Sequence, residues 1–143
     1  MDDASVSRAL WQAHHVVEQA LDDALAPLGM STSLVGTMGF IAEHPGLSAA
    51  DLARLARVKP QSVAHVIGRL AELDLITRSP HPVHGRVIRL HLTDLGWRTL
   101  DRAAAVAAEI EGQLTAGLSD DTRRHLLITL DHLRETAEQL RAQ

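Results

Sequence analysis

The chain has 143 residues, of which 45% are hydrophobic and 22% are charged, as expected for one folded domain. It has no cysteine, which excludes disulfides, thiolate catalysis and cysteine-ligated zinc, and it lacks the apolar run of about 18 residues that a membrane span needs. The N-terminus is acidic and lacks the apolar segment of a secretory signal, so we expect a cytoplasmic protein.

Charge is distributed unevenly along the chain. The formal net charge is −4, which argues against a uniformly basic nucleic-acid-binding coat. Residues 47–93 nevertheless contain seven Arg or Lys residues against three Asp or Glu, so a basic centre lies between acidic flanks. This asymmetry predicts a polyanion-binding module within a scaffold. With two Trp, one Phe and no Tyr, the chain offers few platforms for stacking single-stranded bases.

Two helices are predicted in the first third of the chain. Apolar residues recur at helical spacing over residues 5–27, and a proline and a glycine mark the end of that segment. A second helix is predicted over residues 33–43. It ends at His44, because the residue before Pro45 disfavours the helical conformation.

The next segment has the pattern of a helix-turn-helix. Ser48 lies three residues before Asp51, close to the capping box that begins a helix. After a short turn, Pro60 suits the first position of another helix, which is predicted to end near residue 74. Two short helices joined by a few residues are typical of DNA-binding helix-turn-helix units.

A hairpin and two long helices complete the predicted fold. Residues 75–78 and 86–92 favour strands, and residues 79–85 between them contain two prolines and a glycine. Further helices are predicted over residues 94–116 and from residue 119 onward. The expected fold class is mainly α with a small β-hairpin wing: a winged helix-turn-helix between N- and C-terminal helices.

Residues 30–96 resemble the MarR (multiple antibiotic resistance regulator) family of winged-helix transcription factors. The matching segments are AEHPGLSAADLARLARVKPQSVAHVIGRLAELDLITRSPHP and IRLHLTDLG. The resemblance implies one domain over 1–143, with residues 31–93 as the DNA-binding lobe. It also implies that residues 1–30 and 94–143 form a helical dimerisation region.

The resemblance further implies a function. Members of this family bind pseudo-palindromic double-stranded operators as homodimers, and many release DNA when a small aromatic acid or phenol binds. The chain is therefore expected to be a sequence-specific regulator, most simply a ligand-responsive repressor.

The predicted recognition helix carries the candidate base-reading residues. Gln61, Ser62 and His65 would face a major groove, where Gln can pair with adenine and His can donate to guanine. The wing residue Arg86 would enter a narrow minor groove. Further basic residues are candidate phosphate contacts: Lys59, Arg54, Arg57, Arg69 and Arg78.

The sequence contains residues that suit two kinds of effector. An aromatic acid or phenol could bind in a cleft lined by Trp11, His14, His15 and Met38, although such residues at helical spacing also suit a core. The resemblance implies zinc as an alternative effector, since some members of the family respond to metals, but the nine histidines of this chain include no His-x₃-His or His-Glu-x-x-His pair. Surface histidines are the simpler interpretation, so no metal site is predicted.

Dimerisation is also predicted from apolar surface. The first and last helices carry more leucine and valine than one small lobe can cover, and a twofold dimer would bury that excess. The alternative function is a winged-helix protein-interaction or architectural module without sequence-specific DNA binding. No enzyme is predicted, because the sequence lacks a Gly-rich phosphate loop and a Gly-x-Ser-x-Gly nucleophile motif.

Overall fold

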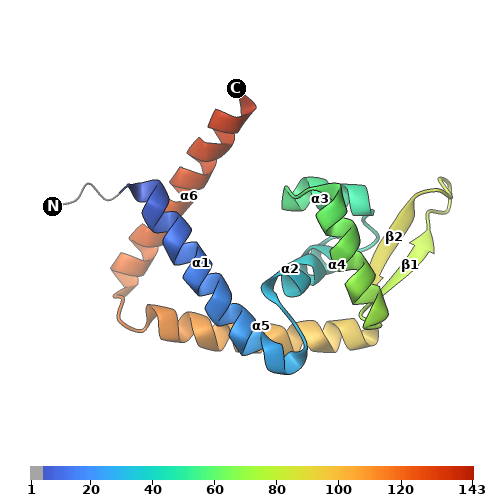
Figure 1. Ribbon diagram of the computed structural model, residues 1–143, viewed down its shortest axis with the longest axis horizontal. Coiled ribbons are helices and arrows are strands. Elements are labelled where there is room, and N and C mark those ends of the chain that lie inside the picture. The colour runs from blue at the N-terminus through green and yellow to red at the C-terminus, as the bar shows by residue number, and fades with distance from the viewer. Residues whose placement is uncertain (1–4) are drawn as a thin grey trace. The chain divides into compact units, whose positions relative to one another are not determined.

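The structure, a computed structural model, describes residues 5–143. The acidic N-terminal residues 1–4 lie outside the described residues. The elements follow the predicted order and confirm a mainly α fold with a two-stranded hairpin (Figure 1). They are α1 (Val6–Leu25), η1 (Ala26–Leu28), α2 (Thr32–Glu43), α3 (Ala49–Ala56), α4 (Pro60–Glu72), β1 (Ile76–Pro80), β2 (Ile88–Leu92), α5 (Asp94–Thr115) and α6 (Asp120–Ala142).

The chain divides into two compact units, one through Ile110 and one from Glu111. The first contains the hydrophobic core, to which helices α1 to α4 and the hairpin all contribute. The largest fully buried side chains are Leu25, Met38, Ile41, Leu52, Leu70 and Leu90. Because these come from α1, α2, α3, α4 and β2, one shared core fixes the helix-turn-helix and the wing together.

The wing pairs with a third segment that the sequence does not indicate. Strands β1 and β2 pair antiparallel from Ile76 opposite Leu92 to Pro80 opposite Ile88. Residues 46–48 pair with the other edge of β2: the Leu90 N–H donates to the Leu47 carbonyl at 2.9 Å. The turn before α3 is therefore tied to the wing, which explains how a short hairpin keeps its position beside the helices.

Two polar contacts set where helices begin. At α3, the Ser48 hydroxyl accepts from the Asp51 N–H, and the Asp51 carboxylate accepts from the Ser48 N–H, each at 3.1 Å. This confirms the predicted capping box. At α2, the Thr32 N–H donates to the Asp22 carboxylate of α1 at 2.7 Å. That second contact ties the end of α1 to the start of α2.

The approach of α5 to the hairpin requires a glycine. A Cβ at Gly96 would lie 2.1 Å from the Leu75 carbonyl oxygen, far inside contact distance. The Thr93 hydroxyl accepts from the Gly96 N–H at 2.9 Å and donates to the Asp74 carbonyl at 2.7 Å. The start of α5 is thus held against the segment that leads into β1.

The second unit contains the end of α5 and all of α6. The Ser119 hydroxyl accepts from the Thr122 N–H at 3.2 Å and caps α6. Arg134 donates to Asp131 and Glu138 on adjacent turns, and these hydrogen bonds raise the pKa of its guanidinium. α6 keeps no buried residue within the single chain.

Among the described residues, no single helix is long and apolar enough to cross a membrane. The segments Val6–Leu28 and Thr32–Glu43 reach that length and apolarity only as a pair, across an 80° bend.

Candidate nucleic-acid interface

Helix α4 has one buried face and one exposed face. Val63, Ile67 and Leu70 are buried in the core, at the spacing of three and four that places them on one side of a helix. The predicted reading residues Gln61, Ser62 and His65 are all exposed. The structure therefore presents these three side chains together, on a helix whose opposite face is anchored.

The start of α4 has no side-chain cap. Lys59 occupies the N-cap position in extended conformation, and Pro60 is the first helical residue. The backbone closes the turn instead, because the Lys59 carbonyl accepts from the Ser62 N–H at 3.0 Å. A cation and a hydroxyl therefore stand where a helix attracts a phosphate.

The turn between α3 and α4 contains a residue in left-handed conformation. Arg57 ends α3 with φ 56° and ψ 40°, a region that disfavours any side chain with a Cβ. Its neighbour on the helix, Arg54, is exposed but paired with Asp51. The predicted phosphate-contacting role of Arg54 therefore competes with an acidic partner one turn away.

The pKa of the Asp51 carboxyl is lowered by its neighbours. Hydrogen bonds from the Ser48 backbone and hydroxyl, aided by the charge of Arg54, lower the pKa of the Asp51 carboxyl below its ordinary value of 3.8. The carboxylate is therefore charged at neutral pH, where it supports the start of α3.

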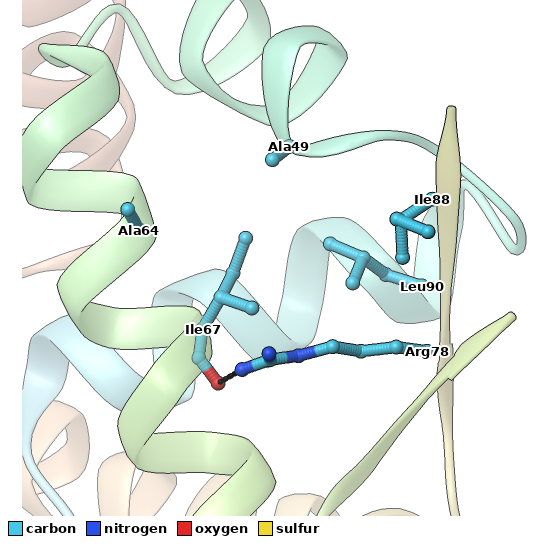
Figure 2. A pocket seen from close by; sticks show the side chains of 6 residues that line it. All are labelled: Ala49, Ala64, Ile67, Arg78, Ile88 and Leu90. Carbon is cyan, nitrogen blue, oxygen red and sulfur yellow. Dashed lines mark hydrogen bonds between the residues drawn. The ribbon is translucent and has the colours of Figure 1, made fainter. Parts of the chain in front are cut away.

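Arg78 was predicted to contact phosphate, but the structure gives its guanidinium another partner. Figure 2 shows the Arg78 side chain extending from β1 toward α4, where it donates to the Ile67 carbonyl at 3.5 Å. It crosses a mostly apolar cavity of about 230 Å³ between the wing and the helices. Its lining residues are Ala49, Ala64, Ile67, Arg78, Ile88 and Leu90. Arg78 thus connects the wing to the recognition helix.

Two further arginines of the wing, Arg86 and Arg89, differ in environment. Arg86 is exposed and lines a groove of about 320 Å³ with residues 48–50 at the start of α3. Arg89 is half-buried, and its guanidinium donates to the Gly46 carbonyl at 3.4 Å. Arg86 is therefore the arginine available to a ligand, while Arg89 fastens β2 to the turn before α3.

The wing tip is organised by a histidine. The Nδ1 atom of His81 accepts from the backbone N–H groups of Val83 and His84, each at 3.1 Å. The two imidazole rings lie 5.2 Å apart. His81 must therefore present an unprotonated Nδ1 to hold this loop.

The predicted effector residues are not brought together. Met38 is fully buried, at 0% exposure, because its side of α2 packs into the core, so the prediction that it lines a cleft is wrong. Trp11 is 67% exposed and stacks on His15, with ring centroids 5.6 Å apart. His14 lies 3.6 Å from Glu18 on the same helix. Three of the four residues are thus accessible on α1.

The described residues also bear on metal binding. Within residues 5–143, no group of three or more His, Cys, Asp or Glu side chains could hold a metal ion.

Comparisons with known proteins place this geometry in a family. The model of the MarR family matches residues 28–87. The HTH-type transcriptional repressor Rv2887 of Mycobacterium tuberculosis is 30% identical over 132 residues, covering 92% of this chain and 95% of the relative. The repressor Mb2911 of Mycobacterium bovis matches with the same identity and coverage.

Solved structures agree with these relatives. The transcriptional repressor CouR, bound to a 23-mer DNA duplex, superposes with a TM-score of 0.86 at 25% identity over 91% of this chain and 92% of that one. Rv2887 of Mycobacterium tuberculosis in complex with salicylic acid gives 0.74 at 30% identity, over 92% and 98%. The chain therefore belongs to the MarR family of transcriptional regulators.

Proposed function

We propose that this chain is a cytoplasmic transcriptional repressor that binds a pseudo-palindromic double-stranded operator as a homodimer. The observation that carries this proposal is the exposed row of Gln61, Ser62 and His65 on a helix whose other face is locked in the core. A rigid helix with polar side chains on its free face suits the major groove. Arg86 at the wing would brace the adjacent minor groove.

The apolar surfaces of the helical region support the homodimer. α1 exposes Val6, Leu10, Trp11 and Val16, and α6 exposes Leu126, Leu127, Ile128, Leu130 and Leu140. Large exposed apolar residues at this density favour association, and a twofold dimer buries the same surface on both copies. Such a dimer would place its recognition helices about 34 Å apart, one turn of DNA.

DNA release by a small aromatic acid is part of the proposal. It is supported by the complex of the 30% identical relative with salicylic acid. On this chain, the exposed Trp11–His15 stack provides an aromatic surface beside an imidazole. Binding there would reduce DNA affinity by favouring a different placement of the lobes.

The decisive experiment is a salt-dependent titration with a duplex from upstream of the gene, against an unrelated duplex of equal length. We expect a preference of at least about 10³-fold and a steep loss of affinity with salt. Gln61→Ala should reduce the preference by about 5- to 150-fold, because a base contact is lost. The matched control, Gln139→Ala at an exposed position of α6, should leave this preference unchanged.

Equal, weak binding to both duplexes would contradict the proposal and favour a protein-interaction or architectural module. Salicylate added to the preformed complex tests the effector. We expect release from the chain that carries Trp11 and weaker release after Trp11→Ala. Release that is unchanged by that substitution would place the effector site elsewhere.

A further inference from the structure

A second polar surface lies beside the base-reading face of α4. The α2–α4 hollow is a depression of about 310 Å³ between these helices. Its lining residues are Ser31, Ser33, Leu34, His65, Val66 and Arg69. One hydroxyl from the N-cap of α2 and one from its first turn thus line the depression with an imidazole and a guanidinium from α4 and two apolar side chains, and no carboxylate is among these lining residues.

The donors in this hollow are side chains rather than the end of α2. The Thr32 N–H already donates to Asp22 at 2.7 Å, and the Leu34 N–H donates to the Ser31 hydroxyl oxygen at 3.3 Å. The Ser31 hydroxyl keeps its own hydrogen to donate, as does the exposed hydroxyl of Ser33. With Arg69 the hollow therefore offers several donors and a fixed positive charge, the chemistry that holds a phosphate oxygen.

The position of the hollow along α4 matches the edge of a major groove. Gln61 and Arg69 are eight residues apart, which is about 12 Å along a helix axis. A major groove is also about 12 Å wide. Each four-residue step also turns about 40° past a full circle, so Arg69 lies about 80° around the axis from Gln61. A helix that reads bases with Gln61 and His65 thus brings Arg69 to the DNA backbone.

We propose that the α2–α4 hollow binds a backbone phosphodiester of the operator, and that Ser31 and Ser33 are DNA-contacting residues. This inference rests on the proposed function and adds a second helix to the interface. The contact holds the register of α4 in the groove but reads no base. Glu72, whose carboxylate lies 3.4 Å from the Arg69 guanidinium, competes with the phosphate for that cation.

The test is Ser33→Asp, which separates binding from folding. α2 has no acidic residue in its first turn, and a carboxylate there favours the helix dipole. Because the Asp22 carboxylate already lies at this end of the helix, the thermal midpoint should change little. Affinity for operator and for unrelated duplex should both fall at least about tenfold, and the salt slope should fall by about one unit for each protomer of the dimer, because each protomer loses one phosphate contact.

Ser7→Asp is the matched control. It adds the same charge to the first turn of α1, which also lacks an acidic residue, and it lies outside the helix-turn-helix. We expect less than about a twofold loss of affinity, from net charge alone. Glu72→Gln should have the opposite effect to Ser33→Asp and strengthen binding, because Arg69 loses its competitor.

A duplex with one neutral methylphosphonate, walked along the backbone, locates the contact. At one position in each half-site, the neutral linkage should weaken DNA binding by the natural chain but should not further weaken DNA binding by the Ser33→Asp variant. If the natural chain prefers its operator but Ser33→Asp and Ser7→Asp bind equally, the hollow is not a phosphate site and the inference is overturned. If the natural chain shows no operator preference, the proposed function itself fails.

Discussion

Position 57 allows a sharp test of the turn that places the recognition helix. Its backbone lies at φ 56° and ψ 40°, where an L residue with a Cβ is disfavoured by about 1–2 kcal/mol. Arg57→Ala removes the guanidinium and keeps this strain, whereas Arg57→Gly removes both. Part of this gain is lost, because the greater conformational freedom of glycine in the unfolded chain lowers stability by about 0.5–1 kcal/mol. The free energy of unfolding should therefore be about 1 kcal/mol higher for the glycine variant than for the alanine variant.

Inside a helix, alanine should instead be more stabilising than glycine. Gly36 lies within α2, and a Cβ added there meets nothing within 4 Å. Gly36→Ala should therefore stabilise the protein by about 0.5–1 kcal/mol. Urea unfolding at one fixed protein concentration measures all the variants, because the stability of a dimer depends on concentration. An Arg57→Ala protein as stable as Arg57→Gly would refute the reasoning from backbone strain.

DNA binding gives an independent measurement at position 57. Both variants lose the guanidinium, so both should lose about one unit of salt slope for each protomer of the dimer and bind DNA equally weakly. The two variants would then have equal DNA affinity, but Arg57→Gly would have the higher free energy of unfolding. An unchanged salt slope in both would show that Arg57 touches no phosphate, whatever its effect on stability.

Three further substitutions test the packing around the interface. Gly96→Ala should destabilise the protein by more than about 3 kcal/mol, because its Cβ would meet the Leu75 carbonyl at 2.1 Å; unfolding that matches the natural chain would contradict this. Asp51→Asn should lower the unfolding midpoint at pH 7. Since hydrogen bonds from Ser48 hold the pKa of Asp51 below 3.8 in the folded state, the stability that this carboxylate contributes is present above about pH 4 and lost below it. The two proteins should therefore converge as the pH falls, and a constant difference down to acid pH would count against the capping carboxylate. Met38→Ala should cost about 2–5 kcal/mol in urea unfolding, as for a fully buried side chain, and a loss below about 1 kcal/mol would place Met38 at a surface.

The helix-turn-helix and its reading face could be predicted from local patterns. The Ser48–Asp51 capping box, Pro60 at the start of α4 and the buried row through Val63 depend on residues three or four positions apart. Such spacings determine helix ends and helix faces wherever the helix packs. For this reason the exposure of Gln61 and its neighbours followed from sequence, together with the fold class and family resemblance.

Contacts between distant segments could not be predicted in this way. Periodicity indicates which face of α2 is apolar, but only packing decides that Met38 is enclosed while Trp11 on α1 is exposed. Arg78 is of the residue type that contacts phosphate, yet its guanidinium donates to the Ile67 carbonyl because β1 lies beside α4.

Local sequence patterns specify the order of elements, the ends of the DNA-binding helices and the side chains that face outward, because these depend on spacings within one or two helical turns. Only the folded chain shows which segments meet. It brought Ser31 and Ser33 of α2 beside Arg69 of α4, across more than thirty residues of chain. It also placed the start of α5 so close to Leu75 that only glycine fits at position 96. Such contacts form because apolar faces from several elements are buried together in one shared core. The spacing of residues within one element does not specify which other element covers its apolar face.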